Sequence, residues 1–168
     1  MIHGNNRRVL IVDDNPAIHD DFRKILALGA YDDDSLSVKE ELLFGESTES
    51  HVRQRFEVET ALQGQEGVEM VLTARREGQP YAVAFVDIRM PPGIDGIETI
   101  ERVTAIDPEI QFVICSAYSD YSAYEILLRL GVSDRLLLLR KPCDAAEILL
   151  MTCAMCEKWN LAHNVRAT

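Results

Sequence analysis

The chain of 168 residues lacks any uncharged apolar run of the roughly 18 residues that a membrane span requires. Its first six residues lead directly into Arg7 and Arg8, without the longer apolar stretch and cleavage site of a signal peptide. We therefore expect a cytoplasmic protein with no membrane partner.

Basic residues are also scarce. The chain has 17 Lys and Arg against 28 Asp and Glu, which gives a formal net charge of −11. A nucleic-acid-binding surface is normally basic, and the sequence contains no DNA-binding motif. We therefore expect no nucleic-acid partner.

The four cysteines form neither a disulfide framework nor a recognisable zinc site. Cys153 and Cys156 have C-x-x-C spacing, but no second pair and no nearby histidine cluster completes a metal site. They lie within a helical pattern, so we expect them to pack in that helix. Structural disulfides are rare in cytosolic proteins.

Short apolar runs do alternate with helical patterns along the chain. Apolar residues make up 47% of it, enough for one packed domain. Runs such as RVLIV and AVAFV are wholly apolar, as expected of strands covered on both faces of a parallel sheet. The expected strands span residues 8–12, 55–60, 82–86, 110–115 and 135–139.

Helical spacing occupies the intervals between these strands. Pro16 suits a first helical turn, and Gly78 and Gly131 suit helix ends. The expected helices span residues 16–28, 65–76, 94–106 and 121–130, and Asp144 is expected to cap a last helix that runs to about residue 161. Five strands alternating with five helices predict a doubly wound α/β fold, with a parallel sheet and helices on both faces. Such sheets bind ligands at the carboxyl ends of their strands.

Residues 29–54 interrupt this alternation with an unusually long connection. It contains an acidic turn at residues 32–34 and a short helical pattern at residues 36–44. Two interpretations are open, a packed surface insertion and a dedicated partner site, and we favour the insertion.

Polar residues follow four of the expected strands. Asp13 and Asp14 follow the first, Asp87 ends the third, Ser116 follows the fourth and Lys141 the fifth. Each alone suits a helix cap, a turn or a solvated charge, but convergence on one edge of a sheet favours a site. Three carboxylates in one cleft repel each other unless a cation lies among them, and an oxygen-only site suits Mg²⁺. A carboxylate nucleophile with a metal, an ammonium and a hydroxyl suits phosphoryl transfer.

The segments VLIVDDNP, FVDIRMPPGIDG, VICSA and RKP resemble the four hallmark segments of response-regulator receiver domains. They occur in the family's order over nearly the whole chain. The resemblance implies a flavodoxin-like fold with strand order 2-1-3-4-5. It also implies a phosphorelay switch, not itself an enzyme, whose phosphoryl donor is a histidine kinase or phosphotransfer domain.

The resemblance further implies a role for each site residue. Asp87 is expected to be the phosphoacceptor, and Asp13, Asp14, Asp87 and the backbone carbonyl of Arg89 to form the Mg²⁺ site. Ser116 resembles the hydroxyl that moves toward the phosphoryl group. Lys141 would pair with the phosphate, and the Lys141–Pro142 bond is expected to be cis.

The sequence departs from the family pattern at three places. The loop MPPGIDG is one residue longer than the common MPxxDG form, and its prolines should stiffen it. Leu138 occupies the position where the family usually has an aromatic switch residue. Either Tyr118 or Tyr121 takes over the role of that aromatic residue, or both tyrosines only pack or face solvent. We favour the second interpretation. Arg89 and Tyr118 are bulky residues at positions thought to influence hydrolysis, so we expect slow loss of the phosphoryl group.

We assign residues 1–159 to the receiver domain and residues 160–168 to a tail. The apolar residues Ile148, Met155, Trp159 and Ala162 either extend the last helix toward a coiled coil or pack it on the sheet. A homodimer through the last helices is one expectation. The chain resembles N-terminal receivers of multidomain signalling proteins, in which a linker leads to a histidine kinase or to cyclic-di-GMP domains.

Two other functions compete with an active receiver. A pseudo-receiver would use the same fold as an interaction module, but it usually lacks an acidic residue or the lysine, and all are present here. A haloacid-dehalogenase-like phosphatase needs a second carboxylate two residues after its nucleophile. Arg89 occupies that position, which argues against a phosphatase.

Overall fold

The computed structural model describes residues 5–27, 56–117 and 122–167, and the insertion at 29–54 lies outside these residues. Five strands form one parallel sheet in the order β2-β1-β3-β4-β5, which confirms the predicted fold. The strands are Arg8–Val12 (β1), Glu57–Ala61 (β2), Val83–Asp87 (β3), Gln111–Ser116 (β4) and Leu136–Arg140 (β5).

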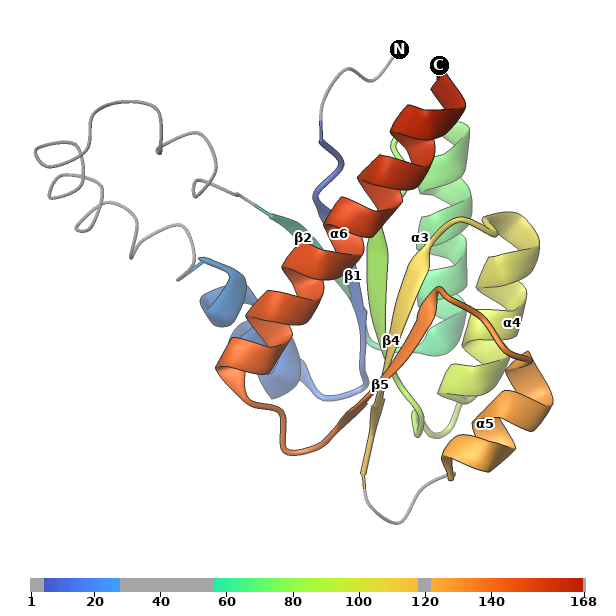
Figure 1. The fold of residues 1–168 in the computed structure, drawn as a ribbon. Helices are drawn as coiled ribbons and strands as arrows, with labels where there is room; N and C mark the ends of the chain where they lie inside the picture. Colours follow the sequence, from blue (N-terminus) through green and yellow to red (C-terminus); the bar gives the residue numbers. More distant parts are fainter. Residues whose placement is uncertain (1–4, 28–55, 118–121, 168) are drawn as a thin grey trace, which may run out of the picture.

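Helices cover both faces of the sheet (Figure 1). They are Gly64–Arg76 (α3), Gly96–Ile106 (α4), Ala123–Leu130 (α5) and Ala145–Ala167 (α6), and residues 16–27 form a further helix, here called the first helix. The first helix and α6 lie on one face, and α3, α4 and α5 on the other. Among the described residues, no helix has the length and apolar character needed to cross a bilayer.

Alternate residues of the central strands supply the two halves of the core. Leu10 and Val12 of β1 face the side of α3–α5, whereas Val9 and Ile11 face the first helix and α6. On the latter side Phe22 meets Phe85 of β3 edge-on, with ring centroids 4.9 Å apart. Burial on both faces explains why these strands are wholly apolar.

Two helices begin later than the sequence predicts. The helix expected from residue 94 begins at Gly96, because Asp95 accepts a hydrogen bond from the Glu98 amide as an N-cap. The helix expected from residue 121 begins at Ala123, because Ser122 and Glu125 form a capping box.

The last helix is longer than expected, since α6 runs to Ala167 and includes most of the predicted tail. Ile148, Met155 and Trp159 are buried against the sheet, whereas Ala162 is exposed. Cys156 is buried in the same layer, which confirms the expectation that it packs in the helix. The homodimer through this helix stays a prediction.

Candidate functional site

Three carboxylates gather at the carboxyl edge of the sheet. Asp13 and Asp14 follow β1 directly, and Asp87 is the last residue of the neighbouring strand β3. One oxygen from each carboxylate lies within 4.8 Å of the other two. Asp13 and Asp87 are buried and Asp14 is half-buried, so much of this negative charge is shielded from water.

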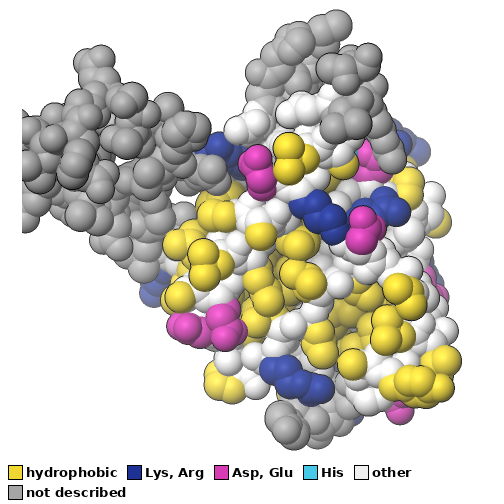
Figure 2. Space-filling model, in the orientation of Figure 1, with side chains coloured by type: hydrophobic (Ala, Val, Ile, Leu, Met, Phe, Trp, Pro, Cys, Tyr) yellow, Lys and Arg dark blue, Asp and Glu magenta, His cyan; other side chains and the backbone are white. Residues whose placement is uncertain are grey.

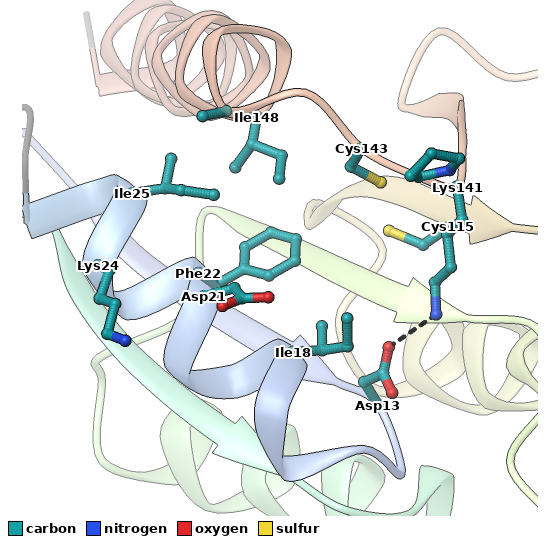
Figure 3. A pocket seen from close by; sticks show the side chains of 12 residues that line it. Asp13, Ile18, Asp21, Phe22, Lys24, Ile25, Cys115, Lys141, Cys143 and Ile148 are labelled. Atoms are coloured by element: carbon teal, nitrogen blue, oxygen red, sulfur yellow. Dashed lines mark hydrogen bonds and ion pairs between the residues drawn. The ribbon is translucent and has the colours of Figure 1, made fainter.

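Lys141 directly follows the edge strand β5 and reaches the same cluster. Its Nζ lies 3.1 Å from Oδ2 of Asp13 and 3.4 Å from Oδ1 of Asp87. Figure 3 shows the ammonium pointing at Asp13. The backbone of Lys141 donates to the carbonyl of Ser116 at 2.9 Å, which extends the β4–β5 pairing to the site. Burial opposes the charged form of Lys141, but the two carboxylates prevail and raise its pKa.

One ammonium does not balance three carboxylates. Burial, followed by the charge of Asp13, raises the pKa of Asp87 to about 6, although Lys141 acts in the opposite direction. An all-oxygen cluster with surplus negative charge is the environment that a hard divalent cation stabilises. The residues present therefore fit Mg²⁺.

A buried histidine supports this cluster from the first helix. Nε2 of His19 donates a hydrogen bond to the backbone carbonyl of Asp13 at 2.8 Å. The carboxylate of Asp13 accepts a hydrogen bond from the amide of Asn15 at 2.9 Å, which fixes its orientation. Sequence reasoning missed His19, whose only signal is its place six residues after Asp13 on the inner side of a helix.

Ser116 and Arg89 lie beside the cluster. Ser116 is fully buried at the end of β4, one residue beyond Cys115, which is the register partner of Asp87. Its hydroxyl donates to the carbonyl of Ala117 at 3.0 Å. Arg89 lies in the loop after β3, and its side chain is exposed.

Comparison with known proteins identifies the family. A sequence profile described as the response regulator receiver domain matches residues 32–152, most of the chain. The chain belongs to the response regulator receiver domain family. The match begins after β1 and the two aspartates that follow it, Asp13 and Asp14. β1 is nonetheless part of the same sheet and lies between β2 and β3.

One relative of known sequence matches a shorter segment of this chain. The chain is 35% identical over 71 residues to YesN of Bacillus subtilis (strain 168), described as an uncharacterized transcriptional regulatory protein. That match covers 42% of this chain and 18% of YesN, so the matched segment is less than a fifth of this relative.

Solved structures share the receiver fold at low identity. One is described as adenylate cyclase from Rhodopirellula baltica, with a TM-score of 0.70, 21% identity and coverage of 96% of both chains. Another is a CheY-like response regulator receiver domain protein from Methanospirillum hungatei JF-1, with a TM-score of 0.64, 21% identity and coverage of 93% of this chain and 98% of that chain. At this identity the likeness concerns the fold alone.

The long loop after β3 packs tightly in this receiver. Both the Pro91–Pro92 bond and the expected Lys141–Pro142 bond are cis. The amide of Gly96 donates to the carbonyl of Ile88 at 2.8 Å, so α4 begins against the end of β3. Met90 is buried and anchors the loop.

Leucine occupies the position at which the family usually has an aromatic switch residue. Leu138 is half-buried and packs on the core layer formed with α3–α5. The tyrosines considered as its replacements, Tyr118 and Tyr121, lie outside the described residues. Their roles stay predictions.

Proposed function

We propose that this receiver accepts a phosphoryl group on the carboxylate of Asp87 from a histidine kinase or a phosphotransfer domain. An oxygen of Asp87 attacks phosphorus and forms a P–O bond. The P–N bond of the donor phosphohistidine breaks, and the imidazole leaves with the electron pair. The product is an acyl phosphate on Asp87.

The observation that carries this proposal is the contact of one ammonium with two buried carboxylates. Lys141 lies within 3.4 Å of both Asp13 and Asp87, at the edge where doubly wound sheets bind ligands. A phosphoryl group on Asp87 would bring new negative charge within reach of the same ammonium. Lys141 then stabilises the charge that develops during transfer.

Asp13, Asp14 and Asp87, with the backbone carbonyl of Arg89, would hold Mg²⁺. When bound, the ion supplies positive charge to the phosphoryl oxygens. The Asn15 amide orients the carboxylate of Asp13, and His19 holds its backbone carbonyl. Asp87 is 8% exposed. Ser116 would donate its hydroxyl to a phosphoryl oxygen after leaving the carbonyl of Ala117, which its hydroxyl contacts at 3.0 Å.

We infer that phosphorylation acts as a conformational switch for a partner or a further domain. The regulatory relative YesN is more than five times as long as its matched segment, since the match covers 18% of it. A receiver spanning only part of such proteins suits a regulatory module.

The test is intact mass spectrometry after incubation with acetyl phosphate and Mg²⁺. We expect one added phosphoryl group on the wild-type chain and none on Asp87→Ala or after chelation of the metal. Asp20→Asn is the matched control, because Asp20 is an exposed carboxylate in the first helix. It should be phosphorylated like the wild type.

A chain that gains no phosphoryl group under any of these conditions would instead be a pseudo-receiver. Addition that survives in Asp87→Ala would move the acceptor to another residue. Each result refutes a different part of the proposal.

A further inference from the structure

Two cysteines flank the residues proposed to respond to phosphorylation. Cys115 immediately precedes Ser116 at the end of β4, and Cys143 lies two residues after Lys141. Ser116 is the register partner of Arg140, so these segments of β4 and β5 run side by side. The proposed phosphoryl transfer uses neither thiol.

The two thiols face each other. Figure 3 shows their sulfur atoms pointing toward one another, and the interaction between the two thiols shifts the pKa of both. Sγ of Cys143 also lies 3.8 Å from the carbonyl oxygen of Arg140. Both line a cavity of about 440 Å³ between the first helix and the start of α6, which Asp13 and Lys141 also line. In the same orientation as Figure 1, Figure 2 shows apolar side chains gathered on this face.

The two thiols differ in exposure and acidity. Cys115 is 4% exposed, and the neighbouring Cys143 thiol, together with burial, raises its pKa. Cys143 is half-buried. The neighbouring Cys115 thiol and the charge of Lys141 lower its pKa, against the effect of desolvation. A more acidic, accessible thiol beside a buried one is the arrangement of an attacking and a resolving cysteine.

We propose that Cys143 and Cys115 form a redox modification site that closes to a reversible disulfide when a peroxide oxidises it. The thiolate of Cys143 attacks one peroxide oxygen, which gives a sulfenic acid and, with hydrogen peroxide, one water after protonation. The sulfur of Cys115 then attacks the sulfenic sulfur and releases a second water. Two thiols lose two electrons and two protons, and the peroxide is reduced.

Closing this disulfide changes the site, and this part of the inference rests on the proposed function. The two sulfurs are not bonded in the structure and must approach to a bond of about 2.05 Å, so the segments that carry them must shift. Lys141 and Ser116 lie within two residues of the bond. Because misplacement by about 1 Å can cost a hundredfold in rate, we expect phosphorylation to slow by about tenfold or more.

The first experiment treats the full chain with hydrogen peroxide, blocks free thiols and maps linked peptides by mass spectrometry. We expect one link, Cys115 to Cys143, that dithiothreitol removes. The double variant Cys153→Ser/Cys156→Ser is the matched control and should form the same link. Cys143→Ser, a change at a half-buried position, should lose it. Absence of the link in the wild type, or a link that maps to Cys153 and Cys156, refutes the redox site.

The second experiment compares phosphorylation rates of reduced, oxidised and re-reduced chains with acetyl phosphate and Mg²⁺. We expect the rate to fall on oxidation, to recover with dithiothreitol and to be insensitive to peroxide in Cys143→Ser. Equal rates for reduced and oxidised chains would refute the effect on the switch. A reduced chain that gains no phosphoryl group would refute the proposed function instead, and the linked peptides would still decide the redox site.

Discussion

Asp87 lies in surroundings that disfavour its charge when no metal is bound. Burial and the charge of Asp13 raise its pKa from 3.8 to about 6. Between these values the folded chain binds more protons than the unfolded chain. The contribution of Asp87 therefore makes the metal-free protein less stable as pH rises from about 4 to about 6.

Removing this charge should stabilise the metal-free protein. At neutral pH we expect Asp87→Asn to raise the free energy of unfolding by about 1–3 kcal/mol, measured by urea denaturation with a chelator present. The gain should shrink as pH falls from about 6 to about 3, where Asp87 is largely protonated in both states. Excess Mg²⁺ should also reduce it, because the ion stabilises the folded wild type. Asp20→Asn should show no such gain, and an equal gain at all pH values would contradict the explanation.

Lys141 competes with a cation for the same carboxylates. Its Nζ contacts both Asp13 and Asp87, and like charges a few ångströms apart repel by several kcal/mol before screening. We expect Lys141→Met to bind Mg²⁺ about tenfold more tightly by isothermal titration calorimetry, which corresponds to about 1.4 kcal/mol. Lys158→Met is the matched control, because Lys158 pairs with Asp134 instead. Unchanged or weaker binding by Lys141→Met would show that the ammonium does not oppose the ion.

At the scale of elements, the start of α4 requires glycine at position 96, because there is no room for a side chain. A Cβ on Gly96 would lie 2.2 Å from the backbone oxygen of Asp87, where nothing flexible can move aside. We expect Gly96→Ala to cost roughly 3 kcal/mol or more of unfolding free energy and to slow phosphorylation by displacing Asp87. Both are measured by urea denaturation and by mass spectrometry with acetyl phosphate.

Gly78→Ala is the control for this element. Gly78 has a φ of +70° but no atom within 4 Å of an added Cβ, so alanine should cost only about 1 kcal/mol of backbone strain. It lies after α3, at the opposite edge of the sheet from the site. Equal losses in the two variants would mean that the contact with Asp87 does not explain the need for Gly96.

The elements themselves were largely predictable from the sequence. Each strand is a short run with a clear apolar or alternating pattern, and the observed strands start and end within two residues of the expected ones. The errors fall at helix starts, where a cap such as Asp95 or Ser122 decides the boundary and periodicity carries no information. The end of α6 was missed because polar residues near its end hide a continuing helix.

The site was predictable only where topology brings residues together. Parallel strands place Asp13, Asp87 and Lys141 at one edge regardless of side-chain detail. By contrast, the hydrogen bond from His19 to a backbone carbonyl and the contact between Cys115 and Cys143 depend on local geometry. No spacing rule relates those pairs, so sequence reasoning did not find them.

At the scale of the whole molecule, hydrogen bonds join α6 to the segment before β1, at the edge of the sheet opposite the site. The amide of Asn6, before β1, donates to Oδ1 of Asn160 in α6 at 2.7 Å, and Nδ2 of Asn160 donates back to the carbonyl of Asn6 at 3.0 Å. Asn6 also donates through Nδ2 to the carbonyl of Pro80 at 2.9 Å. Both asparagines are buried, so this contact joins the two ends of the described chain and the entrance to β3.

We expect Asn160→Ala to lower the free energy of unfolding by about 2 kcal/mol, because it leaves buried backbone groups of Asn6 without partners. The control is Asn164→Ala, an exposed asparagine one turn further along α6, which should cost far less in the same urea denaturation. Magnesium affinity, measured by calorimetry, should be equal in both variants and the wild type, since the carboxylates lie at the other edge of the sheet. A loss of affinity in Asn160→Ala alone would show that the two edges are coupled through α6, whereas unchanged stability would show that water replaces Asn160 at no cost.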